Sequence, residues 1–185
     1  MFKENKAAQI AAYFLHRAGD TMQHVKLMKL MYLADREALD SYGLSISNDT
    51  AYSMRLGPVL SQTLDLMNGN FDPSDGGEWV KWITAKENYH LGLKKPVTED
   101  SFRALSDGEI SILRKVYDKY GDWSMDRLIR HTHTFGEWRN PGRGRIPIEV
   151  GDVFQALGKT DAEIEAKLGY IQDEEEIEEI LASIR

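Results

Sequence analysis

The chain has 185 residues, of which 42% are hydrophobic and 29% are charged, and its formal net charge is −7. These values are typical of a globular protein with one main domain, and they exclude a largely disordered chain. The absence of cysteine excludes disulfides, thiolate nucleophiles and cysteine-based zinc sites. No apolar run is long enough to cross a membrane, and the first residues lack the apolar stretch of a signal peptide, so we expect a cytoplasmic protein without membrane partners.

The negative charge is confined to the C-terminal end of the chain. Residues 161–185 contain nine acidic and two basic side chains, so the residues before them carry no net charge. An acidic segment repels phosphate backbones and attracts basic surfaces, although many such segments are only solvated tails. The neutral remainder has no basic stripe, which argues against nucleic-acid binding. We expect a domain at residues 1–158 and an acidic helical extension at residues 159–185.

The N-terminal part of the chain predicts two helices and then a strand. Apolar residues recur with helical spacing in residues 3–18 and 23–42, and a glycine follows each segment. Residues 51–56 show an alternation that is typical of a strand. A Gly-Pro pair then breaks the strand, and we expect Pro58 to be the first residue of a helix that continues to about Met67.

The middle of the chain predicts a loop and a β-hairpin. Residues 68–77 consist almost entirely of residue types that favour turns. Residues 79–85 and 89–94 are rich in β-formers and are joined by three polar residues, which favours a hairpin. Trp79 and Trp82 would then point to opposite faces of one strand, with one in the core and the other partly exposed.

The second half of the chain is predicted to be helical. Capping residues indicate helix starts at Ser106, Ser124 and Thr160, and we expect another helix to run from Pro147 to Gly158. The order of helices, a short β-region and further helices predicts an α+β fold that is mostly α-helical. Its helices would surround a small antiparallel sheet of about three strands.

Asp35 is the most unusual residue of the helix predicted at residues 23–42. At about 100° per residue it falls on the apolar side of that helix, whereas Lys29 falls on the polar side. A carboxylate in an apolar environment is either paired or strongly shifted in pKa. Asp35 is therefore a catalytic or switch carboxylate, or, as we favour, a structural acid. Its candidate partners are Ser53, Arg55 and His131.

Other candidate sites are weak. His131 and His133 are two residues apart, so on a helix they point about 200° away from each other and cannot share a metal ion. The glycine-rich loop at residues 140–145 lacks the spacing of a phosphate-binding loop. The sequence therefore assigns no catalytic residue, no cofactor and no metal ligand.

Two surfaces are candidates for partner binding: one side of the predicted hairpin and the apolar stripe of the last helix. Their residues are Trp79, Trp82, Tyr89 and Leu91 in the hairpin and Ile177, Ile180, Leu181 and Ile184 in the helix. The helical stripe either docks on the body of the protein, which is slightly favoured, or enters a groove of a partner. The glutamates beside the stripe suit a basic partner.

Two blocks of the sequence resemble the Panacea domain, the SocA-like antitoxin domain that is also phage-associated. The first block contains KLMKLMYLADRE at residues 26–37, YG at 42–43 and YSMRLGPV at 52–59; the looser second block contains LS at 105–106, YGDWS at 120–124 and residues 131–138. The residues that carry the motif are Lys29, Tyr32, Asp35, Arg36, Met54, Gly57, Pro58, His131 and Trp138. The resemblance covers roughly residues 5–150.

This resemblance implies an α-rich fold with a small sheet and an antitoxin that neutralises a toxin encoded beside it. Members of the family mostly bind their varied toxins directly, and one branch is an adaptor that delivers its toxin to a Clp-type protease. The resemblance carries over no catalytic residues, so it implies a protein that is not an enzyme. The alternative from another class is a hydrolase that uses Asp35 with His131, which requires an open pocket holding both side chains. A regulatory interaction module outside any toxin pair is a further alternative.

Overall fold

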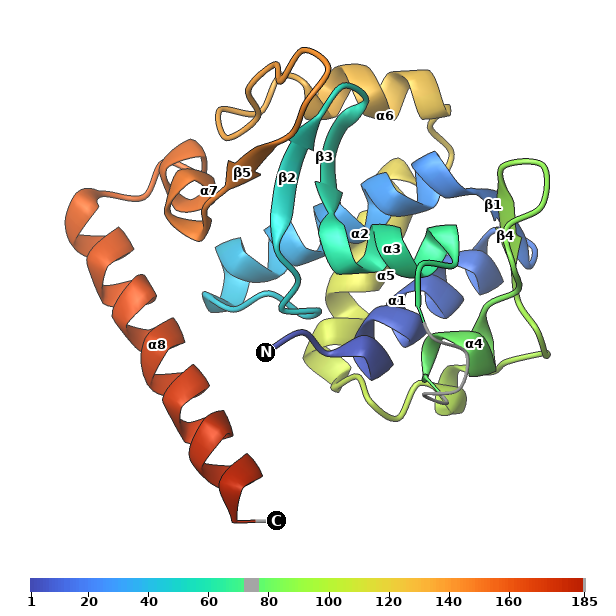
Figure 1. The fold of residues 1–185 in the computed structure, drawn as a ribbon, viewed down its shortest axis with the longest axis horizontal. Coiled ribbons are helices and arrows are strands. Elements are labelled where there is room, and N and C mark those ends of the chain that lie inside the picture. Colours follow the sequence, from blue (N-terminus) through green and yellow to red (C-terminus); the bar gives the residue numbers. More distant parts are fainter. Residues whose placement is uncertain (72–76, 185) are drawn as a thin grey trace.

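The computed structural model describes residues 1–71 and 77–184. In this part of the chain, helices dominate and two small antiparallel sheets complete the fold (Figure 1). The helices are α1 (Glu4–Arg17), α2 (His24–Tyr42), α3 (Ser61–Asn68), α4 (Trp79–Trp82), α5 (Asp107–Tyr120), α6 (Met125–Thr132), α7 (Val150–Ala156) and α8 (Asp161–Ser183). The strands are β1 (Thr21–Gln23), β2 (Ala51–Met54), β3 (Gly57–Leu60), β4 (His90–Gly92) and β5 (Ile146–Ile148). The predicted α+β, mostly helical fold class is confirmed.

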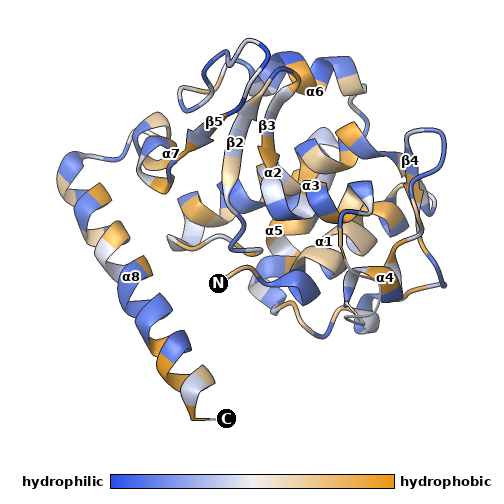
Figure 2. Ribbon diagram, in the orientation of Figure 1, coloured by the Kyte–Doolittle hydropathy of each residue, from blue (hydrophilic) through white to orange (hydrophobic). Residues whose placement is uncertain are grey.

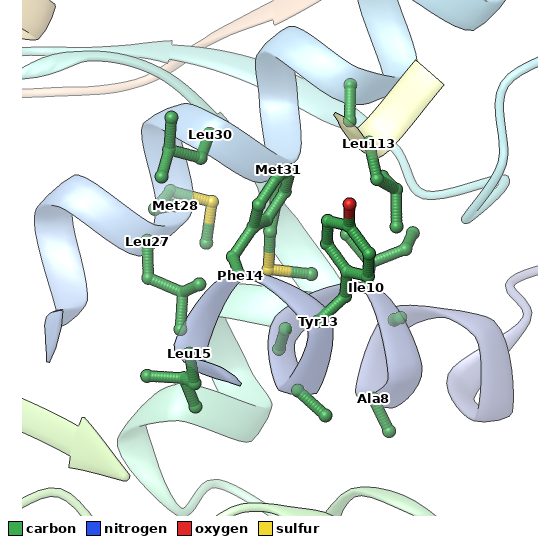
Figure 3. Close-up of a cluster of buried hydrophobic side chains, with 14 of the residues drawn as sticks. Ala8, Ile10, Tyr13, Phe14, Leu15, Leu27, Met28, Leu30, Met31 and Leu113 are labelled. Atoms are coloured by element: carbon green, nitrogen blue, oxygen red, sulfur yellow. The ribbon is translucent and has the colours of Figure 1, made fainter. Parts of the chain in front are cut away.

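The hydrophobic core forms around α1 and α2. Figure 3 shows Phe14 of α1 next to Met31 of α2, and Ile10 of α1 next to Leu113 of α5. Helix α1 also packs against α4, and its alanines are fully buried. Small side chains let neighbouring elements approach the helix closely, so α1 can be covered on several sides at once. The two helices predicted in this region are confirmed, with ends within one residue of those expected.

The three-stranded sheet has the order β3-β2-β5. Pro58 lies in β3 opposite Ser53, so the prediction that it starts a helix is wrong, and α3 begins at Ser61 instead. A strand at the edge of a sheet tolerates proline because one side of its backbone needs no partner. Gly57 has a φ of +97°, which favours glycine and allows the tight turn from β2 into β3.

Pro147 also lies in a strand rather than at the start of a helix. It is in β5 opposite Tyr52, and the following helix, α7, begins at Val150. The reason is the same as for β3, because β5 forms the other edge of the sheet. Gly158 follows α7 with a φ of +79°, so the expected end of this helix is confirmed.

The predicted hairpin is wrong in its first arm. Trp79 and Trp82 belong to α4, which packs on α1, and both side chains are buried. Residues three apart lie on the same side of a helix, so both tryptophans enter the core, whereas alternation along a strand would have separated them. Strand β4 pairs with β1, and Ile83 forms only an isolated bridge with Leu93. Residues 72–76 of the predicted loop lie outside the described residues.

Predictions based on local capping signals are confirmed. Ser106, Ser124 and Thr160 each accept a hydrogen bond from the backbone N–H three residues later. The side chains of Glu109 and Glu163 complete two capping boxes by accepting from the backbone of the cap residue. Within the described ranges, no helix combines the length and hydrophobicity that a membrane crossing requires.

Candidate functional site

Asp35 is buried and holds the chain that follows α2. Its Oδ1 accepts hydrogen bonds from the backbone N–H groups of Ile46, at 2.9 Å, and Ser47, at 3.0 Å. Its Oδ2 accepts a third bond from the Ser47 hydroxyl. Burial raises the pKa of Asp35 to about 6, although the three donors favour the ionised form. Asp35 therefore has the geometry of a structural acid.

The partners expected for Asp35 are wrong. The Ser53 hydroxyl instead accepts a hydrogen bond from the backbone N–H of Arg139, at 3.1 Å. His131 Nε2 lies 3.4 Å from the Tyr120 hydroxyl, and its ring packs among aromatic side chains. The true partners come from the loop directly after α2, a segment in which no periodic pattern marks a buried position.

A second buried cluster joins α2 to the segment after α6. Arg36 Nε lies 2.6 Å from Glu137 Oε1, and the Tyr32 hydroxyl donates to the same oxygen at 2.9 Å. The Glu137 side chain has no exposed surface, and the Arg36 guanidinium also lies 4.2 Å from the centre of the Phe135 ring. Burial beside this carboxylate raises the pKa of Tyr32. The sequence interpretation missed Glu137 in this role, because its partners on α2 are about a hundred residues away in the chain.

Lys29 is buried, so the prediction that it lies on a polar face is wrong. Its Nζ donates to the carbonyl oxygen of Pro58 at 2.5 Å. Gly57 makes room for it, since a Cβ there would lie 3.1 Å from Lys29 Nζ and 2.6 Å from Thr132 Oγ1. Burial lowers the pKa of Lys29 to about 7.

This lowered pKa gives a pH-dependent contribution to stability. The folded protein releases the Lys29 proton near pH 7, whereas the unfolded chain keeps it until about pH 10.5. Because the unfolded state binds more protons in this window, Lys29 makes the protein more stable as the pH rises from 7 to 10.5, by at most about 1.4 kcal/mol per pH unit. Urea titrations at several pH values give the free energy of unfolding of the wild type and of K29M. The wild-type value minus the K29M value should rise with this slope. A flat difference would contradict the burial of a titrating lysine.

The other motif residues also make internal contacts. Trp138 Nε1 donates to the carbonyl oxygen of Met54 at 3.2 Å, and the Trp138 ring stacks on His133 with centroids 4.0 Å apart. Burial, followed by the positive charge of Lys29, lowers the pKa of His133. These contacts tie the segment after α6 to the three-stranded sheet. The motif residues thus maintain the fold where α2, the sheet and α6 meet.

The structure does not bring Asp35 and His131 together. A cavity of about 220 Å³ beside Asp35 is lined by residues of α2, the following loop, β5 and α7, and His131 is not among its lining residues. Within the described ranges, no group of three or more His, Asp or Glu side chains could hold a metal ion. The arrangement required by the hydrolase alternative is therefore absent around Asp35.

The predicted binding surfaces differ in what they expose. Trp79, Trp82 and Leu91 are buried, so they offer no surface to a partner. Tyr89 is 73% exposed, and it is the residue of the predicted hairpin surface that remains accessible. The four apolar residues of the α8 stripe are 50–75% exposed, so the favoured expectation that this stripe docks on the body is wrong. The candidate interaction surface therefore lies mainly on α8.

Helix α8 runs along one side of the body (Figure 1). Its first turns pack on α7, where Ile164 and Ile171 contact the cluster that contains Phe154. Further along the helix, the contact is ionic: Lys3 Nζ lies 2.6 Å from Glu178 Oε1. The attachment is thus apolar near the start of α8 and electrostatic near its end.

Two adjoining cavities lie between α8 and the body. One, of about 430 Å³, is lined by Tyr42 and Leu44 of the body and by Ile171 of α8. The other, of about 860 Å³, lies between the N-terminal residues and the last turns of α8. Both are lined by Lys3, Glu175 and Glu178, so the ion pair between α8 and the N-terminus lies where the two cavities meet.

A helical domain whose motif residues bind one another, and whose exposed apolar stripe lies on a peripheral helix, has the features of a protein-binding module. The family of antitoxins described as "Antitoxin SocA-like, Panacea domain" matches this chain over residues 27–139. The match covers more than half of the chain, so the protein belongs to this antitoxin family, and the resemblance seen in the sequence is confirmed. Comparison with curated proteins and with solved structures gives no match. Helices α1, α7 and α8 lie outside the matched segment.

Proposed function

We propose that this protein is an antitoxin that neutralises a cognate toxin by binding to it directly. The observation that carries the proposal is the match to the SocA-like antitoxin family over residues 27–139. The mechanism is occlusion: the antitoxin covers the surface that the toxin needs for its activity, and no covalent bond forms or breaks. The toxin would be encoded beside the antitoxin, and the complex would form in the cytoplasm.

The buried motif supports a binding function over a catalytic one. Asp35, Glu137 and Lys29 are buried charged side chains of the body, and each is engaged by an internal partner. A catalytic acid or base must reach the atom whose proton it moves. Groups held inside the fold in this way stabilise the scaffold, and the recognition surface lies outside them.

The division of the chain fits the same proposal. The motif-bearing body, residues 1–158, would provide a stable scaffold, and residues 159–185 would form an acidic extension specific to this member. The family match ends at residue 139, so a partner-specific element can lie beyond it. Tyr89 and the apolar stripe of α8 are the proposed contact residues.

Co-expression with the product of the neighbouring gene tests this function. We expect that product alone to stop growth and the antitoxin to restore it. The two proteins should elute together in size-exclusion chromatography, and toxin abundance on immunoblots should not change. Restored growth with a falling toxin level and no stable complex would instead indicate the proteolytic adaptor. Failure to restore growth would contradict the antitoxin function.

A further inference from the structure

Helix α8 carries two apolar stripes on opposite sides. At about 100° per residue, Ile164, Leu168 and Ile171 point in nearly one direction. The later stripe begins with Ile177 and Ile180 and points to roughly the opposite side of the helix axis. Figure 2 shows hydrophobic positions along α8 that include its C-terminal turns. A single amphipathic face cannot account for this distribution.

The first stripe is used by the protein itself. Ile164 and Ile171 pack against the buried cluster that contains Leu39 and Phe154. The same side of the helix continues with Glu178, which pairs with Lys3, so the body-facing side is apolar at first and then acidic. These contacts account for the position of α8 without any contribution from the second stripe.

The second stripe is exposed. Its four aliphatic side chains are Ile177, Ile180, Leu181 and Ile184, which are 50%, 59%, 55% and 75% exposed, and Tyr170 on the same side is 47% exposed. A helix docked along one side needs only polar residues on the other. Contiguous exposed aliphatic side chains on a monomer mark an interaction site. The stripe runs along about two turns, the length at which i, i+3, i+4 and i+7 anchors enter a groove.

The charges around the stripe define its partner. Glu174 and Glu176 lie on either side of it, Asp173 precedes it, and residues 161–185 carry a net charge of −7. A second copy of this chain would bring the same acidic edges together, which opposes self-association. A partner with an apolar groove edged by lysine and arginine would match both the stripe and its edges.

We propose that the outward stripe of α8 is the anchor that this antitoxin inserts into an apolar groove with a basic edge on its toxin. This inference rests on the antitoxin function proposed above. The body-facing stripe holds α8 on the scaffold, and the acidic edges speed encounter with the basic groove. Binding then buries the aliphatic side chains.

Glutamine substitutions test the anchor, with the product of the neighbouring gene as the probe. Glutamine favours the helix about as well as the residues it replaces, so I177Q/L181Q removes apolar surface and keeps α8 intact. We expect this variant to bind at least tenfold more weakly in isothermal titration calorimetry and to keep the wild-type melting temperature and helical circular dichroism. I164Q/I171Q, on the body-facing side, should instead lower the melting temperature.

A matched pair of charge reversals tests the acidic edge. E176K lies beside the stripe, whereas E165K makes the same change at an exposed position in the first half of α8. We expect E176K to associate with the probe several-fold more slowly than the wild type at low salt, and at nearly the wild-type rate at high salt. E165K should have little effect on the rate. Equal effects of the two reversals would contradict a localised basic contact.

The outcomes separate the anchor from the function. If the wild type and I177Q/L181Q bind the probe equally well, the anchor is wrong and the antitoxin function stands. If the wild type neither binds the probe nor restores growth, both proposals are wrong. If sedimentation shows that the wild type alone is a dimer that I177Q/L181Q dissolves, the stripe is an interface between copies, and the toxin-groove proposal is overturned.

Discussion

Substitution of Asp35 by alanine should lower the free energy of unfolding by about 3 kcal/mol. The change removes the acceptor for the Ile46 N–H, the Ser47 N–H and the Ser47 hydroxyl, all of which are buried with it. A buried donor left without a partner costs about 1–3 kcal/mol, and the cavity beside Asp35 can admit water that recovers part of the loss. The midpoint of urea unfolding, followed by circular dichroism, measures the effect.

A matched variant separates this network from a general loss of packing. S47A removes the hydroxyl donor and leaves both backbone bonds to Asp35, so it should cost about 1 kcal/mol. The double variant D35A/S47A should cost less than the sum of the two single changes, because both remove the same bond. Strict additivity, or a D35A variant as stable as the wild type, would contradict the observed network.

The raised pKa of Asp35 sets the sign of its pH dependence. The folded protein binds the Asp35 proton up to about pH 6, whereas the unfolded chain releases it near pH 3.8. The folded state therefore binds more protons in this window, and the contribution of Asp35 to stability decreases as the pH rises through it. We expect the free energy of unfolding of the wild type to exceed that of D35A by more at pH 4 than at pH 7. The stability contribution of Lys29 changes in the opposite direction and at higher pH.

The sequence predicted those parts of the fold that depend on neighbouring residues. The helix caps at Ser106 and Thr160 each involve two residues that are three positions apart, and the structure contains both caps. The buried position of Asp35 followed from the periodicity of α2 alone. Long helices are predictable because their pattern repeats over several turns, so that one unusual residue does not hide it.

The errors arose where distant segments decide the structure. Pro58 fits the first turn of a helix by local rules, but pairing with β2 places it in a strand. The segment Trp79–Trp82 is too short for its period to distinguish a helix from a strand. Lys29 is buried because Gly57, on another element, leaves space for it. None of these determinants is local in sequence.

The candidate interaction surface was partly readable from the sequence. The stripe at Ile177–Ile184 is predicted as a candidate from its sequence pattern, but the favoured expectation that it docks on the body is wrong, because its side chains are exposed. Helical geometry gives the angle between this stripe and the earlier stripe that begins at Ile164, and this angle points the later stripe away from the body once the earlier stripe is docked. Which of the two stripes contacts the body could not be predicted, because it depends on the cluster formed with Phe154.

Removal of Glu137 should be the most destabilising single change in the motif region, at about 3–5 kcal/mol for E137A. The substitution leaves the largely buried Arg36 guanidinium without its carboxylate and the Tyr32 hydroxyl without its acceptor. Replacing both members of the ion pair should cost much less, because no uncompensated charge remains. In R36M/E137M, the methionine at position 36 can also keep a contact with the Phe135 ring.

Thermal melts of E137A, R36M and R36M/E137M measure the coupling between the two residues, and toxin binding shows whether the pair has any further role. At a temperature where each variant remains folded, we expect wild-type affinity, because Glu137 has no exposed surface. A double variant as unstable as E137A would mean that shape, rather than charge, makes Glu137 necessary. A stably folded variant that no longer binds the toxin would extend the interaction surface from α8 to the segment after α6, which the internal contacts of Glu137 argue against.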